Sequence, residues 1–478
     1  MTFNSLLFIV FFTIVLTLYY LTPYRFRWIL LLAASYYFYM CWRIEYIVLI
    51  IVSTLVNYYC GLKMGQAPGK TGRREYLILS LIVSLGMLFA FKYFNFFSKS
   101  VEQLFSKLNL AYHVPMLRVL LPVGISFYTF QSLSYTIDVY RGRKEPEKHI
   151  GIFALYVAFF PQLVAGPIER AKNLLPQFRR SNDFDYQRAR DGLGLILWGL
   201  FKKVVIADRL ALYVDQVYSN VFDYQGLSLV IATYFFAVQI YCDFSGYSDI
   251  AIGSAKTMGY DLMNNFDRPY FAKSIREFWQ RWHISLSTWF RDYLYIPLGG
   301  NRCSRPRWYF NLLIVFLISG LWHGANWTFV VWGGLHGIWQ IISVSTSKFR
   351  SLYPRLLRMN DFSLKVIRVL ITFHLVCFGW ILFRANSLSD AAYIVRSIPA
   401  NFLNISGLFV GTSRFEFALA LVFIFILLAV ELFQRSKPGL PFLDAKPMVL
   451  RWSYYYLIVF AIVVFGVTQE SQFIYFQF

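Results

Sequence analysis

Long, uninterrupted apolar runs recur along this chain and limit the folds open to it more than any other feature. Leu6–Leu21 and Trp452–Val467 are two such runs. Lipid admits only helices and closed barrels, because every backbone polar group must be paired within the protein. Barrel strands alternate apolar and polar residues, and these runs do not. The pattern therefore predicts an all-α polytopic membrane protein.

The composition agrees with this fold class, since 58% of the residues are hydrophobic and soluble domains average about 45–50%. We expect roughly ten to thirteen transmembrane or re-entrant helices, with boundaries uncertain by about two to four residues. No internal repeat or soluble module stands out, so we expect one integral-membrane domain over residues 1–478. The expected segments lie near residues 5–21, 28–41, 45–61, 77–94, 150–164, 190–213, 227–248, 309–329, 330–346, 366–383, 415–432 and 452–469.

Basic residues outnumber acidic ones and give the chain a formal net charge of +21. In a soluble protein this charge would suggest nucleic-acid binding. In a membrane protein, lysine and arginine gather in cytoplasmic loops, where anionic lipid headgroups attract them. We therefore expect membrane lipid as a partner and no nucleic acid. A phosphate-bearing or acidic partner at the cytoplasmic face is the alternative.

Motifs of several soluble enzyme classes are missing from the sequence. It has no GxSxG nucleophile elbow, Walker loop or Rossmann glycine fingerprint, which argues against soluble-type serine hydrolysis, ATP hydrolysis and dinucleotide binding. The five cysteines form no CxxC pair, and no His, Asp or Glu cluster has the close spacing of metal ligands. We expect no metal and no permanently bound cofactor.

Two stretches that contain proline and glycine predict interrupted membrane helices. Arg118–Tyr140 has Pro122 and Gly124 ahead of a run rich in Ser, Thr and Tyr, and Phe159–Arg170 reads FFPQLVAGPIER. Proline removes a backbone donor and clashes with the preceding helical turn. Irregular backbone at membrane depth persists only where protein or a water-filled cavity surrounds it. We infer a cavity within the helical bundle.

The interval 264–307 is too charged to span a membrane and too aromatic for a free loop. We expect an amphipathic interfacial and re-entrant region there. Residues at helical spacing predict a polar stripe on one helix within it, and they are Arg276, Gln280, His283 and Ser287. His283 would then line a hydrophilic entrance. Spacing alone fits equally an interfacial helix whose histidine only faces water.

His323 lies inside the strongly apolar stretch LISGLWHGANW. An ionisable side chain at membrane depth is costly and is by default a candidate functional residue. Spacing allows Ser319, His323 and Asn326 to share a helical face. Gly320 and Gly324 would let another backbone or a thin substrate chain approach closely. A buried imidazole can act as the general base that activates a hydroxyl. The alternative is a neutral packed histidine. For His336 we favour packing or a polar side chain that faces the lumen.

Two carboxylates occur in the apolar stretch YCDFSGYSDIAIG, at Asp243 and Asp249. They lie about 240° apart on an ideal helix, so a paired-carboxylate site is not expected. Intramembrane carboxylates usually face a cavity or pair with a base. The possible partners that we consider are Arg268, Arg276 and Arg291. A purely structural ion pair is equally compatible with the sequence.

Five motifs occur in order along the chain: LPVGISFYTFQ (121–131), FFPQLVAGPIER (159–170), YCDFSGYSDIAIG (241–253), REFWQRWHISLSTWFRDYLYIPLGGNR (276–302) and LWHGANWTFVVWGGLH (321–336). Together they resemble the membrane-bound O-acyltransferase (MBOAT) family, and more closely its bacterial alginate O-acetyltransferase-like branch. The likeness extends from the first apolar run to the closing FIYFQF.

The resemblance implies many helices around a central pore. It implies that His323 is the catalytic histidine and that His283 is the second histidine of this branch. The supporting neighbours that it implies are Trp322, Asn326, Asp243 and Arg291, and spacing adds Ser319 and Arg276 as pore-lining candidates. The expected donor is acetyl-CoA or another acyl thioester in the cytoplasm.

The function expected from the resemblance is transfer of an acetyl or other acyl group towards a hydroxyl of an exported polysaccharide. It also implies an extracytoplasmic acetyltransferase partner and a multi-pass location in the bacterial inner membrane. Peptidoglycan O-acetylation and teichoic-acid D-alanylation are alternatives within the family. A transporter or channel without transferase chemistry is the alternative from another class, since broken helices also form translocation paths.

Overall fold

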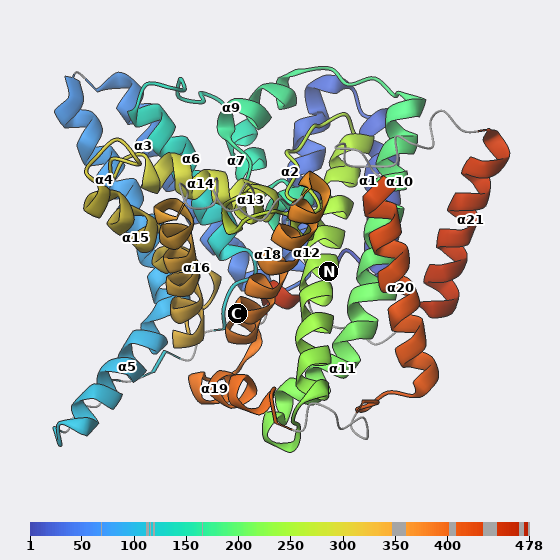
Figure 1. Cartoon of the computed structure of the whole chain (residues 1–478). Helices are drawn as coiled ribbons and strands as arrows, with labels where there is room; N and C mark the ends of the chain where they lie inside the picture. The colour runs from blue at the N-terminus through green and yellow to red at the C-terminus, as the bar shows by residue number, and fades with distance from the viewer. Residues whose placement is uncertain are drawn as a thin grey trace. The chain divides into compact units, whose positions relative to one another are not determined.

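Helices form all the regular secondary structure of the described residues (Figure 1), and these residues contain no β-strand. The computed structural model describes residues 1–67, 69–110, 114, 116–117, 120–164, 166–346, 360–400, 408–433, 447–467 and 473–476. The all-α prediction is confirmed.

Six helices within these residues are long and apolar enough to cross a membrane. The helix Leu6–Leu21 is apolar but shorter. The prediction of ten to thirteen segments also counted short and interrupted elements, which explains the larger number. The six helices cover Ile44–Gln66, Gly69–Lys107, Leu227–Thr257, Asp361–Arg384, Arg414–Phe433 and Met448–Phe465.

The chain divides into two compact units. Unit 1 comprises Met1–Leu193 and Ala251–Met263, and unit 2 comprises Gly194–Ile250 and Asn264–Phe478. Two long helices, α10 and α12, contribute residues to both units. The assignment of the chain as a single domain stays a prediction.

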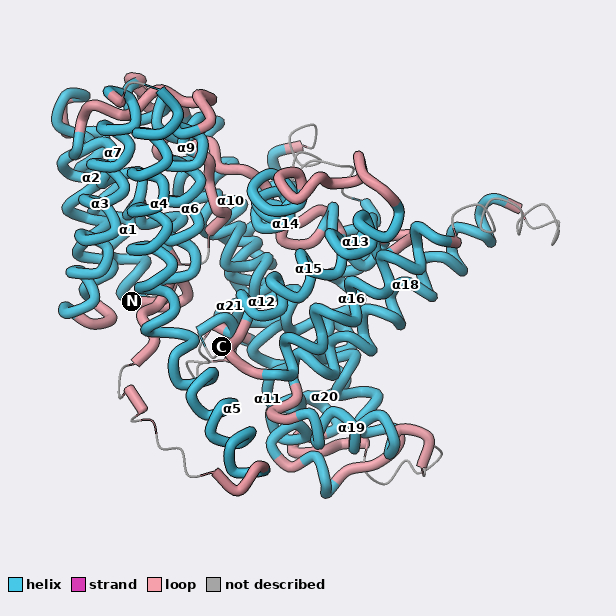
Figure 2. The backbone as a smooth tube through the Cα atoms, turned by 90° about the vertical axis from the view of Figure 1, so that its left-hand side faces the viewer, coloured by secondary structure: helices cyan, strands magenta, loops and turns pink. Residues whose placement is uncertain are grey.

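Unit 1 is built from helices that pack mainly along their lengths. Helix α3 contacts α4 and α6, and α2 contacts α1 and α7, so that these helices run side by side in Figure 2. Its helices are α1 (Leu6–Leu21), α2 (Tyr24–Met40), α3 (Ile47–Gln66), α4 (Gly69–Leu88), α5 (Phe94–Lys107), α6 (Ile125–Tyr140), α7 (Ile150–Ala158), α8 (Phe160–Leu163), α9 (Ala171–Leu174) and the first half of α10 (Tyr186–Leu200).

The two stretches expected to interrupt membrane helices do so in unit 1. Gly124 has a φ of +76° and precedes α6. A Cβ at Gly124 would lie 2.7 Å from the carbonyl oxygen of Leu163, so only glycine allows this close approach. Phe159 separates α7 from α8 and is fully buried. The irregular backbone is therefore surrounded by protein, as membrane depth requires.

Unit 2 contains the remaining helices and a π-helical segment at Phe201–Ala207. They are the end of α10, α11 (Asp208–Ser219), most of α12 (Leu227–Thr257), α13 (Ile275–Arg281), α14 (Ile284–Phe290), α15 (Arg305–His323), α16 (Trp327–Ser345), α18 (Asp361–Arg384), α19 (Leu388–Ser397), α20 (Arg414–Phe433) and α21 (Met448–Phe465).

Glycines bring α10 and α12 into backbone contact within unit 2. A Cβ at Gly199 would lie 2.6 Å from the carbonyl oxygen of Gly246, and a Cβ at Gly246 would lie 2.7 Å from that of Gly199. Small residues allow such close helix packing in membranes. Because the π-helical segment directly follows α10, this packing holds its lysines beside the carboxylates of α12.

A second glycine contact fixes the pair formed by α15 and α16. A Cβ at Gly320 would lie 2.2 Å from the carbonyl oxygen of Phe329, and a Cβ at Gly333 would lie 2.2 Å from that of Phe316. The close approach anticipated at Gly320 is therefore an approach of protein backbone. It fixes the end of α15, where His323 is the last helical residue.

Candidate active site

His283 lies at a sharp break between two short helices. Helix α13 ends at Arg281, α14 begins at Ile284, and His283 between them has a left-handed backbone with φ +44° and ψ +55°. The predicted continuous helix, and with it the polar stripe through Arg276 and Ser287, is wrong. The break turns the imidazole inward, where it is 0% exposed. The alternative of a histidine that faces water is therefore also wrong.

Asn265 provides the contacts that replace helical hydrogen bonds at this break. Its side-chain oxygen accepts from the N–H and the hydroxyl of Ser285 at 3.3 and 2.9 Å, and its carbonyl accepts from Ile284 N–H at 3.0 Å. Its Nδ2 donates to Ser248 of α12 at 3.3 Å. A residue distant in sequence thus stabilises the turn that carries His283, which helical spacing could not indicate.

His323 ends α15, and the chain leaves the helix at Gly324 with an extended backbone. Asn326 belongs to the next element, where its side chain accepts the Thr328 N–H at 3.0 Å and caps α16. The prediction that Ser319, His323 and Asn326 share one helical face is therefore wrong for Asn326. Ser319 lies on α15, one turn before His323, and is buried.

The helix break and the end of α15 bring the two imidazoles together. The ring centroids of His283 and His323 lie 6.2 Å apart, and His323 is only 2% exposed. Trp322, predicted as a neighbour, contacts both histidines with ring-centroid distances of 5.8 Å to His283 and 5.1 Å to His323. Phe244 of α12 and Trp332 of α16 enclose the pair from other sides. Both histidines therefore share one aromatic environment.

The electrostatic surroundings of the His323 and His283 imidazoles differ. His323 lies at the carboxyl end of a nineteen-residue helix, where the helix dipole stabilises a positive charge. His283 lies outside the membrane-spanning helices, and burial lowers its pKa to about 3, so this ring is neutral near pH 7.

Buried ion pairs join two lysines of the π-helical segment to carboxylates of α11 and α12. Lys203 Nζ is 2.6 Å from Asp243 and 2.7 Å from Asp208, and Lys202 Nζ is 2.7 Å from Asp249. Both lysines come from the π-helical segment. Neither lysine was predicted as a partner, although two adjacent lysines in the apolar run GLFKKVVIAD are a signal for buried acidic partners.

The arginines considered as partners of Asp243 and Asp249 have other neighbours. Arg268 pairs with Asp267 at 3.1 Å, Arg291 pairs with Asp292 at 2.8 Å, and Arg276 is exposed. The side chain of Arg291 is 59% exposed. The predicted pairing is therefore wrong, because lysines within the bundle lie closer to the carboxylates. The supporting roles of Arg276 and Arg291 stay predictions.

Tyr475, near the carboxyl end of the chain, reaches the two histidines. Its ring centroid lies 6.2 Å from that of His283 and 5.7 Å from that of His323. The preceding Ile474 donates its N–H to Asp243 at 2.8 Å. Asp243 thus contacts the site through the chain terminus rather than through an arginine. The closing FIYFQF was the only signal for this contact in the sequence.

The two imidazoles lie in a buried, aromatic setting, where they could donate or accept protons. A neutral imidazole can accept the proton of a hydroxyl as that oxygen attacks a carbonyl carbon. The described residues contain no group of three or more His, Cys, Asp or Glu side chains that could hold a metal ion. Imidazoles are among the side chains that acid–base catalysis uses most often.

Comparisons with known proteins agree with this chemistry. The model of the membrane-bound O-acyltransferase family matches residues 148–383, a range that includes both histidines. The probable alginate O-acetylase of Pseudomonas aeruginosa is 42% identical over 424 residues, which are 86% of this chain and 79% of that protein.

Two further relatives act on other polymers of the cell envelope, according to their names. The peptidoglycan O-acetyltransferase of Helicobacter pylori is 36% identical over 398 residues, which cover 77% of this chain and 73% of that protein. The teichoic acid D-alanyltransferase of Bacillus subtilis is 26% identical over 283 residues, which cover 57% of this chain and 70% of that protein.

Proposed function

Because this chain belongs to the membrane-bound O-acyltransferase family and is an O-acyltransferase, we propose that it transfers acetyl groups towards hydroxyls of an exported polysaccharide of the alginate type. The relatives named for alginate O-acetylation are 40–44% identical to it over most of its length. The peptidoglycan O-acetyltransferase is less similar, at 36%.

The observation that carries the mechanism is the meeting of His283 and His323 at 6.2 Å between ring centroids. In the proposed reaction, His323 takes the proton of the acceptor hydroxyl while its oxygen attacks the thioester carbonyl. The thiolate leaves and is protonated, and the oxygen becomes an ester. The negative end of α15 stabilises the imidazolium that forms on His323. His283 positions the donor or relays the proton.

The proposal also covers the acyl donor, the membrane in which the protein lies and its partner protein. The donor is acetyl-CoA or another acyl thioester that enters from the cytoplasm, and the protein lies in the bacterial inner membrane. An extracytoplasmic acetyltransferase partner receives the acyl group or completes its transfer to the polymer. Because aromatic side chains cover both imidazoles, entry of a substrate requires these side chains to move. The open route through a central pore stays a prediction.

Replacement of His323 tests the proposal directly. The variant His323→Gln keeps a polar side chain and removes the imidazole, and we expect O-acetylation to fall by about 10²-fold or more, as for loss of a general base. The measurement is the O-acetyl content of alginate from a producing strain that lacks its own acetylase subunit and carries this chain. Membrane abundance is measured in parallel.

His336 supplies the matched control, since it is a third imidazole buried in the same aromatic core. It contacts Trp332 as His323 does, and its Nδ1 accepts a hydrogen bond from Trp279 at 3.2 Å. Glutamine can keep that acceptor, so His336→Gln should retain most activity. Normal O-acetylation by His323→Gln at equal membrane abundance would contradict a catalytic role for His323. Equal losses of O-acetylation in the His323→Gln and His336→Gln variants would contradict it as well.

Peptidoglycan acetylation is the second candidate, because the Helicobacter relative covers most of both chains. Analysis of both polymers in the same deletion and complementation strains separates the candidates. Loss of acetyl groups from muropeptides, with alginate unchanged, would favour peptidoglycan. Turnover of labelled acetyl-CoA by the purified protein separates either transferase from a transporter, which moves substrate without cleaving the thioester.

A further inference from the structure

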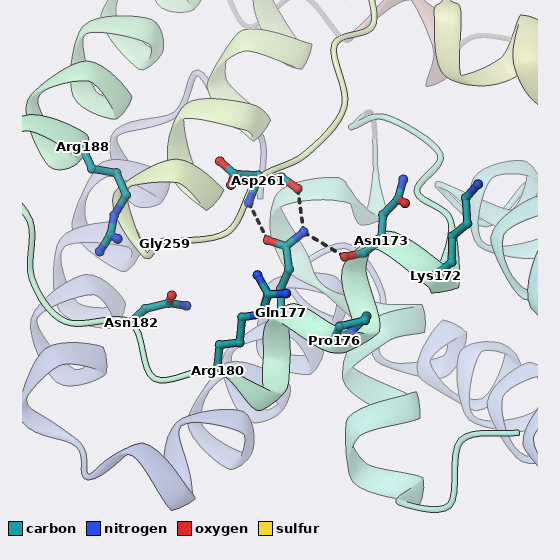
Figure 3. A pocket seen from close by; sticks show the side chains of 9 residues that line it. All are labelled: Lys172, Asn173, Pro176, Gln177, Arg180, Asn182, Arg188, Gly259 and Asp261. Atoms are coloured by element: carbon teal, nitrogen blue, oxygen red, sulfur yellow. Dashed lines mark hydrogen bonds between the residues drawn. The ribbon is translucent and has the colours of Figure 1, made fainter. Parts of the chain in front are cut away.

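A polar cavity of about 480 Å³ lies within unit 1, and neither histidine lines it. The volume falls in the range of small-ligand sites. Residues of the segment 172–188 and of the turn after α12 form its wall (Figure 3): Lys172, Asn173, Pro176, Gln177, Arg180, Asn182, Arg188, Gly259 and Asp261. The lining thus contains three cationic side chains and one carboxylate, which is an excess of positive charge.

Hydrogen bonds between the Gln177 side chain and backbone groups hold the wall of the cavity in shape. The Gln177 side chain accepts from Asp261 N–H at 2.7 Å and donates to the carbonyl oxygens of Asp261 and Asn173 at 3.0 Å each, as Figure 3 shows. Gly259 has a φ of +90°, and a Cβ there would lie 2.6 Å from Asn182 Cγ. Glycine at position 259 therefore leaves room for the Asn182 side chain to pack against the backbone of the turn.

Two buried donors in this wall have no acceptor among the residues that the structure describes. They are Asn182 Nδ2 and Arg188 Nε. The remaining contacts of Arg188 fix its guanidinium, since Nη2 donates to the Asp183 carbonyl and to Tyr20 of α1 at 3.4 Å. Arg27 donates to the Asn182 carbonyl at 2.7 Å and holds that residue in place. Buried donors normally have a partner, so this wall keeps hydrogen-bonding capacity that the described residues do not use.

The surrounding loops place the cavity at a strongly basic end of unit 1. Arg179, next to the cavity residue Arg180, pairs with Glu147, and the neighbouring Pro146 packs against Gly65 near the end of α3. The same end carries basic residues on the adjoining turns of α3 and α4: Lys63, Lys70, Arg73 and Arg74. By the positive-inside rule this end faces the cytoplasm.

From these observations we propose that the cavity binds a phosphate group. Guanidinium and amide donors suit phosphate oxygens, and the excess of positive charge in the lining suits the negative charge of a phosphate group. The group belongs to a soluble cytoplasmic phosphate compound or to the headgroup of an anionic lipid. This site is separate from the acyl-transfer chemistry and does not depend on the polymer that is modified.

The test uses the purified full-length protein and two phosphate sources. In detergent, calorimetry measures binding of inorganic phosphate against chloride at matched ionic strength. In nanodiscs of phosphatidylcholine with or without phosphatidylglycerol, native mass spectrometry measures the lipid that stays bound. The variants are Arg188→Gln and Arg180→Gln. Arg190→Gln is the control, because Arg190 lies on the same helix, pairs with Asp191 and is outside the cavity lining.

We expect each cavity variant to weaken binding about tenfold in at least one arm, and the control to bind as the unchanged protein does. Loss in the phosphate arm assigns the site to a soluble compound, and loss in the lipid arm assigns it to a headgroup. No binding in either arm, or equal binding by cavity variants and control, overturns the proposal. If Arg188→Gln does not fold, Arg180→Gln still tests the proposal, because Arg180 is exposed and its replacement should not disturb folding.

Discussion

His283 combines a left-handed backbone with a fully buried imidazole. A residue other than glycine in this conformation costs about 1–3 kcal/mol and persists only where neighbours determine it. Asn265 is that neighbour, since it takes the hydrogen bonds of the turn. These hydrogen bonds offset the strain, and the strained turn places this imidazole beside His323. A backbone outlier of this kind indicates a functional role.

Substitutions at His283 should separate backbone strain from chemistry. Asparagine tolerates left-handed backbone, whereas β-branched valine does not. We expect His283→Asn to fold and to lose most acetylation, and His283→Val to be less stable than the Asn variant by about 1–2 kcal/mol. Melting temperatures in detergent measure the difference. Equal melting temperatures for the two variants would show that the turn is not strained.

The same residue predicts a pH dependence of stability. Burial lowers the pKa of His283 to about 3 in the folded protein, while in the unfolded chain it is about 6.5. Below pH about 6.5 the unfolded chain binds a proton that the folded protein does not, so stability falls by up to about 1.4 kcal/mol per pH unit. This loss continues until the pH reaches about 3.

Melting curves of the unchanged protein and of His283→Asn, recorded from neutral to acidic pH, measure this effect. The asparagine variant lacks the titrating group, so its melting temperature should fall less steeply on acidification. Parallel curves for the two proteins would contradict a buried neutral imidazole at this position. The comparison cancels the contributions of other titrating groups, which both proteins share.

At the scale of elements, the position of His323 depends on how closely α15 and α16 pack. Gly320 lies one turn before His323, with the backbone of Phe329 in the place of a Cβ. Gly320→Ala should push the helices apart, cost about 1–3 kcal/mol and displace the imidazole. We expect a lower melting temperature together with lower acetylation.

Gly334 on α16 is the matched control for this substitution. A Cβ there would lie 3.3 Å from Leu317 Cδ2, the end of a flexible side chain that can move. Gly334→Ala should therefore keep both stability and activity, and it replaces glycine by a better helix former. If the two alanine variants behaved alike, backbone contact between the helices would not be what positions His323.

Elements were predictable from sequence where apolar runs were long, as for α12, α18 and α20. The interruptions at Gly124 and Phe159 were also predictable, because glycine and proline act locally. The break at His283 was not, since the residue that stabilises it comes from outside the helix. Sequence indicated the histidines but not their partners, because packing between distant segments brings Lys203 to Asp243 and Tyr475 to the imidazoles.

For the whole molecule, the net charge of +21 is unevenly placed. Lys63, Lys70, Arg73 and Arg74 lie around the connection between α3 and α4. The opposite end of α3 has Arg43 and Glu45, which nearly balance. The long membrane-spanning helix Ile44–Gln66 joins these two ends. The positive-inside rule therefore predicts the basic end in the cytoplasm and the other end outside.

Cysteine labelling tests this orientation, because Cys41 is exposed beside the weakly charged end. In a Cys303→Ser background, which removes the other exposed thiol, a small membrane-impermeant maleimide should label Cys41 in intact cells. A cysteine introduced as Lys70→Cys should react only after permeabilisation, since the lipid barrier separates it from the reagent. The opposite labelling pattern would show that unit 1 has the opposite orientation in the membrane. The cationic cavity would then face away from the cytoplasm, and soluble cytoplasmic phosphate compounds would be excluded as its ligands.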